Sequence, residues 1–476
     1  MAIITAPLLA LLASQQTGTR RERLSASLRQ AIAQGTLQKG QRLPSSRLMA
    51  QDLGLSRVTV EAAYSQLESE GYLLRKVGQG TFVAIAMFTD AKPVAATPGI
   101  LALSQRGQQI VATGGCQDPP FPYAFAAGSP ELRAFPHALW RRITASQQRQ
   151  HGEKLMRYGD PQGYLPLRQA VARYLAQSRG VRCDAGQVMI LSSSQQALQM
   201  IALLLLDAGD SVWLEDPCYP GARNAFITAG AQLSPLSLDH QGAQLTAGTP
   251  RLVYLTPSHQ YPTGVTMSLE RRLQWLNFAT TRQSWLIEDD YDSEFYYGGM
   301  PMPAMQGLDN AGRVIYLGTF SKVLFPSLRL AYMVVPPALV EPLRRLRSVI
   351  DGHSAQLPQA ITADFIDNGH FAAHLRLMRQ LYHSRRDLLL EQLTLKLSDR
   401  FLPLDNHGGL QLTVRLTRGD AQQLSAQAAA RGLLLPTLAP LCIRQSAPQQ
   451  GWILGFSALE RTEIIQAVDK LAQLDY

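Results

Sequence analysis

The stretch Tyr316-Leu317-Gly318-Thr319-Phe320-Ser321-Lys322 decides how most of this 476-residue chain is interpreted. Its apolar beginning indicates a buried strand, and the lysine comes directly after the strand's end. An amine at such a place can form a Schiff base with an aldehyde. The commoner alternative is a lysine that merely emerges at a strand end. The remaining lysines of the C-terminal part lie on amphipathic helical stretches, at Lys154, Lys396 and Lys470.

Short apolar runs recur on both sides of this stretch and alternate with long helical patterns. They cover residues 188–191, 211–214, 252–255, 285–287, 314–317 and 331–335. This alternation predicts an α/β domain with a mainly parallel sheet. In such sheets ligands bind at the carboxyl ends of the strands, so polar residues that follow the runs are the candidate site.

Leu286-Ile287-Glu288-Asp289-Asp290-Tyr291 is a strand that runs into a polar cluster. Asp289 and Tyr291 are two residues apart, so they face one side of an extended strand while Asp290 faces the other. A carboxylate can hold the protonated nitrogen of a pyridine ring, and a phenol can donate to a ring oxygen. These residue types fit a pyridoxal ring attached to Lys322.

A phosphate group also has candidate partners. Ser192-Ser193-Ser194-Gln195-Gln196 ends one strand and starts a helix, whose first amides can bind phosphate through Ser194 and Gln195. Ser321 precedes the lysine, and Arg329, seven residues after it, can bind phosphate with two hydrogen bonds. Tyr219 follows another strand and can stack on the ring. The candidate cofactor is therefore pyridoxal 5′-phosphate.

The N-terminal part has a different character. Residues 1–86 hold ten Lys and Arg against five Asp and Glu, which gives a net charge of +5 out of +9 for the chain. Three helical patterns and a hairpin are expected here. The turn at Gly54 between two capped helices indicates a helix-turn-helix. Strands at 72–76 and 81–85 flank Val77-Gly78-Gln79-Gly80.

A helix-turn-helix places the start of its second helix in the major groove of double-stranded DNA. Arg57 and Thr59 lie at this start, Arg47 opens the preceding helix, and Arg75 lies on the hairpin that Gly80 closes. Arginine can bind guanine or phosphate through two donors. We expect these five residues to contact an operator, although exposed arginines also serve solubility alone.

The chain divides into an N-terminal extension (1–21), a DNA-binding domain (22–86), a linker (87–122) and a large domain (123–476). The apolar stretch at 8–13 has no basic residue before it and is too short to span a bilayer, so an extra helix or a poorly ordered arm is expected. Cys116, Cys183, Cys218 and Cys442 form no metal-binding pattern. A cytoplasmic protein is expected, without a membrane segment.

Two sets of motifs resemble known families. Leu43-Pro44-Ser45-Ser46-Arg47, residues 55–60 and residues 71–83 resemble the GntR-type winged helix, although Glu61 stands where many such domains carry a base-contacting arginine. Residues 158–163, 215–217, 257–264, 288–295 and 318–322 resemble aminotransferases of fold type I, and more closely the MocR/GabR-type regulators. The resemblance implies that Lys322 carries the cofactor and that Asp289, Tyr291, Tyr219 and Arg329 hold it.

The sequence departs from the enzyme pattern at three places. Tyr261-Pro262 replaces the usual Asn-Pro, Ser193 stands where relatives often have Gly, and residues 451–457 lack the arginine that binds a substrate carboxylate in enzymes. Arg444 is the nearest substitute. We therefore expect a transcription regulator that binds pyridoxal phosphate as effector or as platform for an amine effector. The resemblance implies a homodimer with exchanged DNA-binding heads.

Two alternatives stay open. The chain could be a working aminotransferase with a vestigial N-terminal domain, because the lysine and its ring partners are present. It could also be an aminotransferase-like scaffold that has lost the cofactor. A basic, intact DNA-binding domain has no use in a plain aminotransferase, and this favours the regulator.

Overall fold

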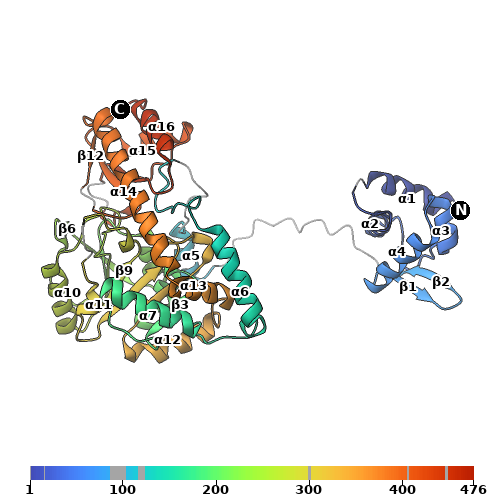
Figure 1. Cartoon of the computed structure of the whole chain (residues 1–476), viewed down its shortest axis with the longest axis horizontal. Coiled ribbons are helices and arrows are strands. Elements are labelled where there is room, and N and C mark those ends of the chain that lie inside the picture. Colours follow the sequence, from blue (N-terminus) through green and yellow to red (C-terminus); the bar gives the residue numbers. More distant parts are fainter. Residues whose placement is uncertain are drawn as a thin grey trace. The chain divides into compact units, whose positions relative to one another are not determined.

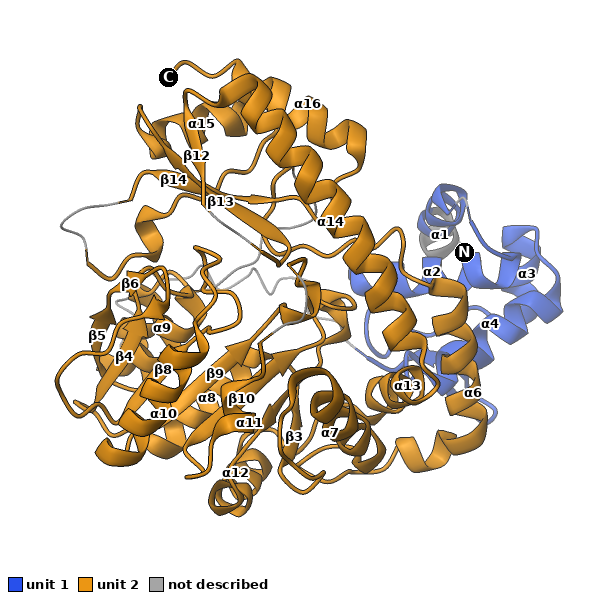
Figure 2. Cartoon of the chain, turned by 60° about the vertical axis from the view of Figure 1, so that its left-hand side comes forward, with its two compact units in different colours: residues 1–102 blue, residues 103–476 orange. Residues whose placement is uncertain are grey.

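A computed structural model of the chain describes residues 2–15, 17–85, 103–115, 124–298, 302–404, 407–444 and 449–476. The chain divides into two compact units, residues 1–102 and 103–476, which Figure 2 colours separately. Among the described helices, none has the length and apolar character that crossing a membrane requires.

Unit 1 is a bundle of four helices with a two-stranded hairpin (Figure 1). Its elements are α1 (Ala2–Ser14), α2 (Arg20–Ala33), α3 (Ser46–Leu53), α4 (Arg57–Ser69), β1 (Leu73–Lys76) and β2 (Gly80–Val83). The apolar stretch at 8–13 thus lies in an extra helix. Its Leu8 is 1% exposed, in one cluster with Leu24 and Leu28.

Local sequence explains where these helices begin and end. The Ser45 hydroxyl accepts a hydrogen bond from Leu48 N at the start of α3, and the Ser56 hydroxyl accepts one from Thr59 N at the start of α4. Such caps satisfy amides that have no acceptor inside the helix. Gly54 ends α3 with a φ of 63°, in the left-handed region that glycine adopts without strain. The hairpin pairs Leu73 with Val83 and Lys76 with Gly80, so β2 begins and ends earlier than predicted.

The centre of unit 2 is a seven-stranded sheet in the order β3-β11-β10-β9-β8-β4-β5. All neighbouring strands are parallel except β11, which is antiparallel to both β3 and β10. This confirms the mainly parallel sheet. The strands are β3 (Val188–Leu191), β4 (Ser211–Glu215), β5 (Gln232–Leu236), β8 (Leu252–Leu255), β9 (Trp285–Asp290), β10 (Val314–Thr319) and β11 (Ala331–Val334).

The edge strand β5 was not predicted, because Pro235 argues against a strand and only Leu236 of its five residues is fully buried. Strand β9 extends three residues beyond the predicted 285–287, and Asp289 and Asp290 therefore belong to the strand itself.

Helices cover both faces of this sheet because every central strand is apolar on both sides. Ile287 and Ile315 pack with α8, α9 and α12 on one face, whereas Leu286 and Val314 pack with α10 and α11 on the other. The helices are α6 (His137–Leu155), α7 (Leu165–Arg179), α8 (Ser194–Leu205), α9 (Pro220–Thr228), α10 (Leu269–Arg282), α11 (Met305–Leu308), α12 (Pro337–Ile350) and α13 (Gln356–Asp367), with short turns η1 (Ser293–Phe295) and η2 (Pro326–Leu328).

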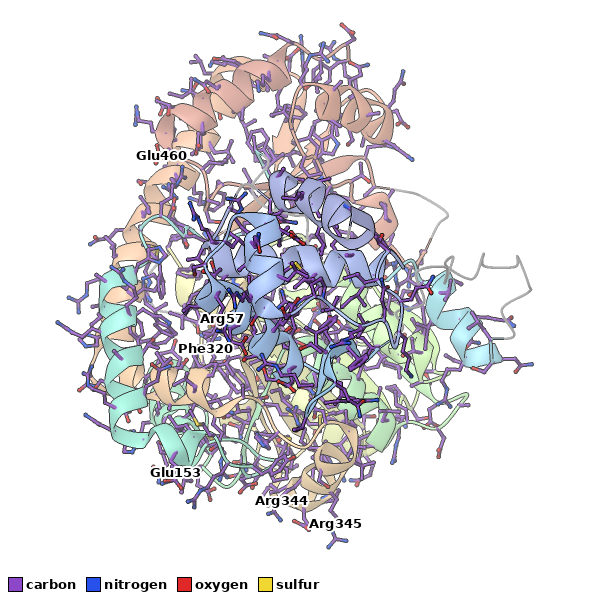
Figure 3. All side chains as sticks on the ribbon, turned by 90° about the vertical axis from the view of Figure 1, so that its right-hand side faces the viewer. Arg57, Glu153, Phe320, Arg344, Arg345 and Glu460 are labelled. Atoms are coloured by element: carbon purple, nitrogen blue, oxygen red, sulfur yellow. The ribbon has the colours of Figure 1, made fainter. Side chains whose placement is uncertain are left out.

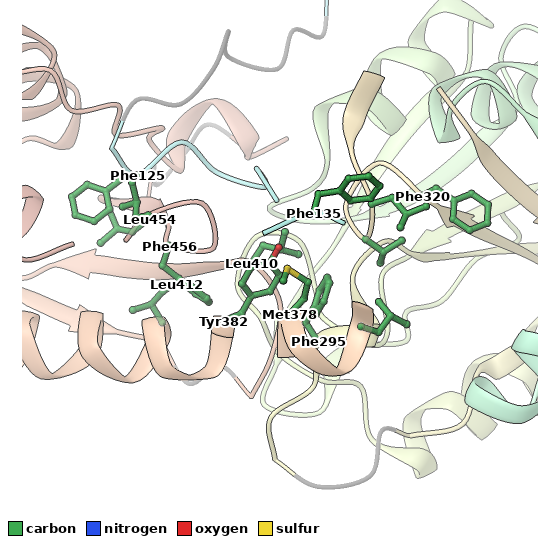
Figure 4. Packing of buried hydrophobic residues seen from close by; sticks show 14 of the residues in the cluster. Phe125, Phe135, Phe295, Phe320, Met378, Tyr382, Leu410, Leu412, Leu454 and Phe456 are labelled. Atoms are coloured by element: carbon green, nitrogen blue, oxygen red, sulfur yellow. The ribbon is translucent and has the colours of Figure 1, made fainter. Parts of the chain in front are cut away.

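A smaller C-terminal layer packs on this body through the long helix α14. It contains an antiparallel sheet, β12-β13-β14, and flanking helices. Figure 4 shows Met378 and Tyr382 of α14 packed beside Phe295 and Leu410, which are buried. The elements of this layer are α14 (His370–Leu397), β12 (Phe401–Pro403), β13 (Gln411–Leu416), α15 (Ala421–Ala430), η3 (Ala439–Leu441), β14 (Gly451–Gly455) and α16 (Arg461–Ala472). Outside this layer, β6 (Leu238–Asp239) and β7 (Gly242–Ala243) form a separate two-stranded sheet.

Part of the expected linker is helical. Residues Gln105–Ala112 form α5, which contacts α9, and the Asn224 side chain donates a 3.0 Å hydrogen bond to Gly115 O. The rest of the expected linker, residues 87–102 and 116–122, lies outside the described residues. The start of unit 2 at Leu103 therefore precedes the predicted domain start at residue 123.

Candidate cofactor site and DNA-binding surface

A cavity of about 560 Å³ opens at the carboxyl ends of the parallel strands in unit 2. It brings together every residue that the sequence suggested for the cofactor: Ser194, Gln195, Tyr219, Asp289, Tyr291, Ser321, Lys322 and Arg329. Ser194 and Gln195 begin α8, which follows β3, and the other residues come from segments after β4 and β10 and from the end of β9. Parallel strands bring these loops to one edge of the sheet although they are far apart in sequence.

Lys322 follows β10 and is partly buried in this cavity. Its Nζ donates a 3.0 Å hydrogen bond to Gly128 O. Gly128 has a φ of +67°, and a Cβ there would lie 2.9 Å from Nζ. Only glycine therefore leaves this room beside the amine. Sequence reasoning missed Gly128, because nothing near it in the chain points to a lysine 194 residues away.

Asp289 lines the cavity and is 5% exposed. Its Oδ2 accepts a 2.6 Å hydrogen bond from the Tyr254 hydroxyl. Burial raises the pKa of Asp289 to about 7, and the Tyr254 hydrogen bond opposes this rise. A positively charged ring nitrogen would restore a low pKa, because an opposite charge favours the carboxylate. Burial also raises the pKa of Tyr291 well above its ordinary value, so this phenol remains a donor.

The prediction that Asp289 and Asp290 face opposite sides is confirmed. Asp290 does not line the cavity; its Oδ2 is 2.8 Å from Arg179 Nε and accepts a 2.6 Å hydrogen bond from the Tyr316 hydroxyl. Arg179 and Asp290 are both nearly fully buried, and the ion pair lowers the pKa of Asp290 against its burial. This pair fixes the end of β9 and with it the direction of Asp289.

The cavity lining also carries hydrogen-bond donors. The Ser193 hydroxyl caps α8 by accepting from Gln196 N at 3.1 Å, and the first amides of the helix, those of Ser194 and Gln195, have no acceptor within the helix. The Gln195 side chain adds no donor, because its Nε2 already donates to Gly221 O at 2.9 Å, so Gln195 would act through its backbone amide. Arg329 has a φ of 52°, a strained conformation for a residue with a side chain, and lines the same cavity. This donor set suits a phosphate group.

Three aromatic rings stand along one side of the cavity. The Tyr261 ring makes edge contacts with Tyr219 and Tyr291, at centroid distances of 5.6 and 6.1 Å. The tyrosine that replaces the enzymes' asparagine thus lies between two predicted ring partners. The cavity also contains Asp292, Thr319 and Gln411, which sequence reasoning did not find. Gln411 lies on β13, and only the packing of the C-terminal layer brings it near Lys322.

Arg444 does not line this cavity. Its guanidinium donates to Ser237 Oγ at 3.1 Å and to Pro235 O at 3.0 Å, and it lines a separate cavity of about 600 Å³. The structure therefore does not bring the suggested substitute carboxylate partner to Lys322.

In unit 1, Arg47 and Arg57 are exposed at the first turns of α3 and α4, and no ion pair or hydrogen bond holds either guanidinium among the described residues. Arg57 is labelled in Figure 3. The Thr59 hydroxyl is 2.8 Å from Ser56 Oγ, so it belongs partly to the helix cap. Gly80 starts β2 with a φ of +113°, and a Cβ there would lie 2.9 Å from Arg42 Nε.

Arg75 differs from the expected open contact on the hairpin. Its Nη1 lies 2.7 Å from Glu61 Oε1, its Nε lies 3.2 Å from Glu68 Oε2, and its Nη2 donates to Ser65 Oγ at 3.0 Å. The guanidinium therefore holds β1 to α4. Glu61 has a structural partner, and this gives a reason for an acid at a position where similar domains carry arginine.

The comparisons with known proteins agree with both units. Residues 20–83 match the family described as bacterial regulatory proteins, gntR family, and residues 127–453 match aminotransferase class I and II. The chain is 40% identical over 450 residues to the probable rhizopine catabolism regulatory protein MocR of Rhizobium meliloti. This alignment covers 93% of this chain and 91% of the relative. It is 36% identical to the HTH-type transcriptional regulator YhdI of Bacillus subtilis, over 94% of both chains.

Among solved structures, the multiple substrate aminotransferase of Thermococcus profundus aligns with a TM-score of 0.70 and 27% identity, over 78% of this chain and 96% of that one. The part of the chain that this enzyme matches is about as long as unit 2, whereas the match to MocR covers almost the whole chain. The chain therefore belongs to the MocR/GabR-type regulators, in which a GntR-family winged helix is joined to a fold type I aminotransferase domain.

Proposed function

We propose that this protein is a cytoplasmic, DNA-binding transcription regulator whose unit 2 binds pyridoxal 5′-phosphate on Lys322 and responds to a small amine. The observation that carries the proposal is the cavity that joins Lys322, buried Asp289 and the donor end of α8 in one chain with a winged helix. We also propose the four-segment division at 1–21, 22–86, 87–122 and 123–476 as the functional layout.

The residues of the cavity fit the cofactor. The α8 amides with Ser194, Gln195, Ser321 and Arg329 would hold the phosphate, Asp289 the pyridine nitrogen, Tyr291 the ring oxygen, and Tyr219 one face of the ring. When bound, the group supplies an electrophilic carbon that amines attack and a ring that withdraws electrons. Tyr254 would keep Asp289 oriented toward the nitrogen, and Gly128 O would hold the Lys322 amine before the cofactor arrives.

An effector acts as a switch only if it binds two states of the protein with different affinity. We propose that an effector amine takes the place of the Lys322 amine at the cofactor, and that this exchange changes the contacts around Tyr261, Tyr219 and Gly128. This change would bias the placement of the winged helices on the operator. Pyridoxal phosphate itself is the alternative effector, and it would change DNA affinity without any added amine.

A homodimer with exchanged DNA-binding heads completes the proposal. Exposed apolar side chains gather near the ends of α6 and α12: Met156 is 87%, Tyr158 98% and Val349 83% exposed. The Tyr158 ring contacts His353, and Ile350 lines the cavity, so this surface is next to the site. Single exposed apolar residues are ordinary, but a group of them indicates a protein interface. The two DNA-binding domains of the dimer would then bind two half-sites of double-stranded DNA.

The deciding experiment is spectral. The purified full chain with added cofactor should show an absorption band near ~420 nm, and borohydride should fix an adduct on Lys322. Lys322→Ala should lose both, whereas the control Lys396→Ala, which removes a surface lysine paired with Asp469, should keep both. A colourless wild-type protein without an adduct would leave only a scaffold without cofactor.

A working aminotransferase is the second candidate, because Lys322, Asp289 and Tyr291 do share one cavity. It predicts many turnovers of amino-group transfer to a keto acid, and the same rate after removal of residues 1–86. The regulator predicts operator binding that an amine modulates and that removal of residues 1–86 abolishes. Binding should be measured at stated salt, because phosphate contacts make it strongly salt-dependent.

A further inference from the structure

The cavity around Lys322 has few positive charges. Among the described residues that line it, the cations are Lys322 and Arg329, while Asp289 and Asp292 are acidic. The proposed function assigns Lys322 to the cofactor's aldehyde and Arg329 to its phosphate. Once the cofactor is bound, the described lining has no cation left for a further anionic group.

β14, the strand on which related enzymes carry the arginine for a substrate carboxylate, does not supply one, because none of its residues lines the cavity. β14 reads Gly451-Trp452-Ile453-Leu454-Gly455, and Ile453 is 1% exposed and packs with Leu438 and Leu441. Arg444 is held at Ser237 and Pro235 in the other cavity.

The arginines next to β14 are already neutralised. The buried Glu131 carboxylate forms ion pairs with two guanidiniums: its Oε2 lies 2.8 Å from Arg385 Nη2 and 3.0 Å from Arg133 Nη2. Arg385 also donates a hydrogen bond to Ser457 O. Moving either guanidinium to a ligand would leave the Glu131 carboxylate buried beside fewer partners, which is costly. Arg133 and Arg385 are therefore already paired with a carboxylate of the protein and do not offer a free positive charge to a ligand.

The remaining polar lining suits hydroxyl groups. Asp292 is 2% exposed and its Oδ1 is 2.9 Å from His259 Nδ1. The Gln411 amide approaches Lys322: a Cβ on Gly128 would lie 2.9 Å from Lys322 Nζ and 3.8 Å from Gln411 Oε1. Amide and carboxylate groups accept from hydroxyls, whereas a ligand carboxylate near Asp292 would meet a like charge without a counterion.

We propose that the effector is an amine that carries hydroxyl groups and no carboxylate, of the amino-alcohol or amino-polyol class. Gln411 and Asp292 are its specificity-determining residues. This inference rests on the proposed function, in which Lys322 holds the cofactor. A buried site that forms hydrogen bonds to a ligand's hydroxyl rejects the analogue that lacks it much more strongly than an apolar pocket does.

The test compares ligands that differ at one group. The cofactor-loaded full chain is titrated with 2-amino-1,3-propanediol and with L-serine, and then with ethanolamine and glycine, while the cofactor band and heat of binding are recorded. In each pair a CH₂OH group replaces the carboxylate. We expect the hydroxylated amine to bind at least about tenfold more tightly in both pairs. Equal binding, or tighter binding of serine and glycine, overturns the inference.

Two substitutions at one position sharpen the result. Gln411→Arg adds a cation at the cavity and should shift the serine-to-diol affinity ratio toward serine by at least about tenfold. Gln411→Met keeps the size but not the hydrogen bonds, so it should weaken the diol, which has two hydroxyls, more than serine, which has one. Arg444→Met is the matched control, and it should leave both ligands unchanged because Arg444 lines the other cavity.

The outcomes separate the two proposals. If the wild-type chain does not take up the cofactor, the proposed function fails. If it takes up the cofactor but prefers the amino acids, or if Arg444→Met abolishes binding of serine, only the present inference fails. Should Gln411→Arg not fold, the wild-type ratios and Gln411→Met still decide.

Discussion

The hydroxyl of Tyr254, on β8, donates a 2.6 Å hydrogen bond to Asp289 Oδ2, on the neighbouring strand β9. Both side chains are almost fully buried. The phenol therefore fixes one carboxylate oxygen and leaves the other for the cavity. The pairing depends on the parallel register of β8 and β9, which places Tyr254 opposite Ile287.

Tyr254→Phe should weaken cofactor affinity without loss of the fold. The substitution removes a hydrogen bond to a charged group, worth about 1.5–3 kcal/mol, and keeps the ring that packs near Phe226. We expect an affinity loss of about tenfold or more, measured by titration of the cofactor band. An unchanged affinity would show that Asp289 needs no help in facing the ring nitrogen.

Gly128→Ala should impair cofactor attachment at Lys322. The new Cβ would lie 2.9 Å from Nζ, and the φ of +67° adds backbone strain of about 1–2 kcal/mol. Gly432→Ala is the matched control, because Gly432 has a φ of +76° with nothing within 4 Å of its Cβ. Both variants should lose similar unfolding free energy, but only Gly128→Ala should lose the borohydride adduct.

Buried Glu215 should make the cofactor-free protein less stable as pH rises. Burial raises the pKa of Glu215 to about 7, against hydrogen bonds from Thr256 and Gln260. Between its ordinary value of about 4.3 and 7, the folded chain holds a proton that the unfolded chain has lost. Its contribution to the free energy of unfolding is thus complete below this window and declines as pH rises through it.

Glu215→Gln removes this titration and keeps an acceptor for Thr256. We expect the difference in Tm between wild type and variant to move in the variant's favour from pH 5 to pH 7.5, by calorimetry or circular dichroism. Other groups titrate equally in both proteins and cancel. A difference that does not vary with pH would mean that Glu215 is ionised throughout.

Arg57→Ala should weaken operator binding by about 1–3 kcal/mol, because no hydrogen bond or ion pair holds this exposed guanidinium among the described residues of unit 1. Arg75→Ala should cost less, since Arg75 is already bound to Glu61 and Glu68. These half-exposed pairs contribute about 1 kcal/mol or less to stability. Fluorescence anisotropy at several salt concentrations compares the two. A larger loss from Arg75→Ala would place the hairpin, not α4, as the main contact.

Much of the architecture was decided by local sequence. The caps at Ser45 and Ser56, the turn at Gly54 and the apolar run before Lys322 act on near neighbours in the chain, so pattern alone located α3, α4 and β10. The two-residue period likewise separated Asp289 from Asp290. Ser194, Gln195, Tyr219, Ser321 and Arg329 could be named because each follows a strand, and strand ends converge.

Only the tertiary structure decided which distant residues complete the site. Gly128, Tyr254 and Gln411 reach the cavity through strand register and the packing of the C-terminal layer, and no local pattern encodes such contacts. The same holds for Arg75 and Arg444, whose sequence positions suggested open guanidiniums but whose charges are bound by Glu61 and by Ser237 and Pro235. A side chain's residue type is written in the sequence, but its partner depends on what the fold brings within hydrogen-bonding distance.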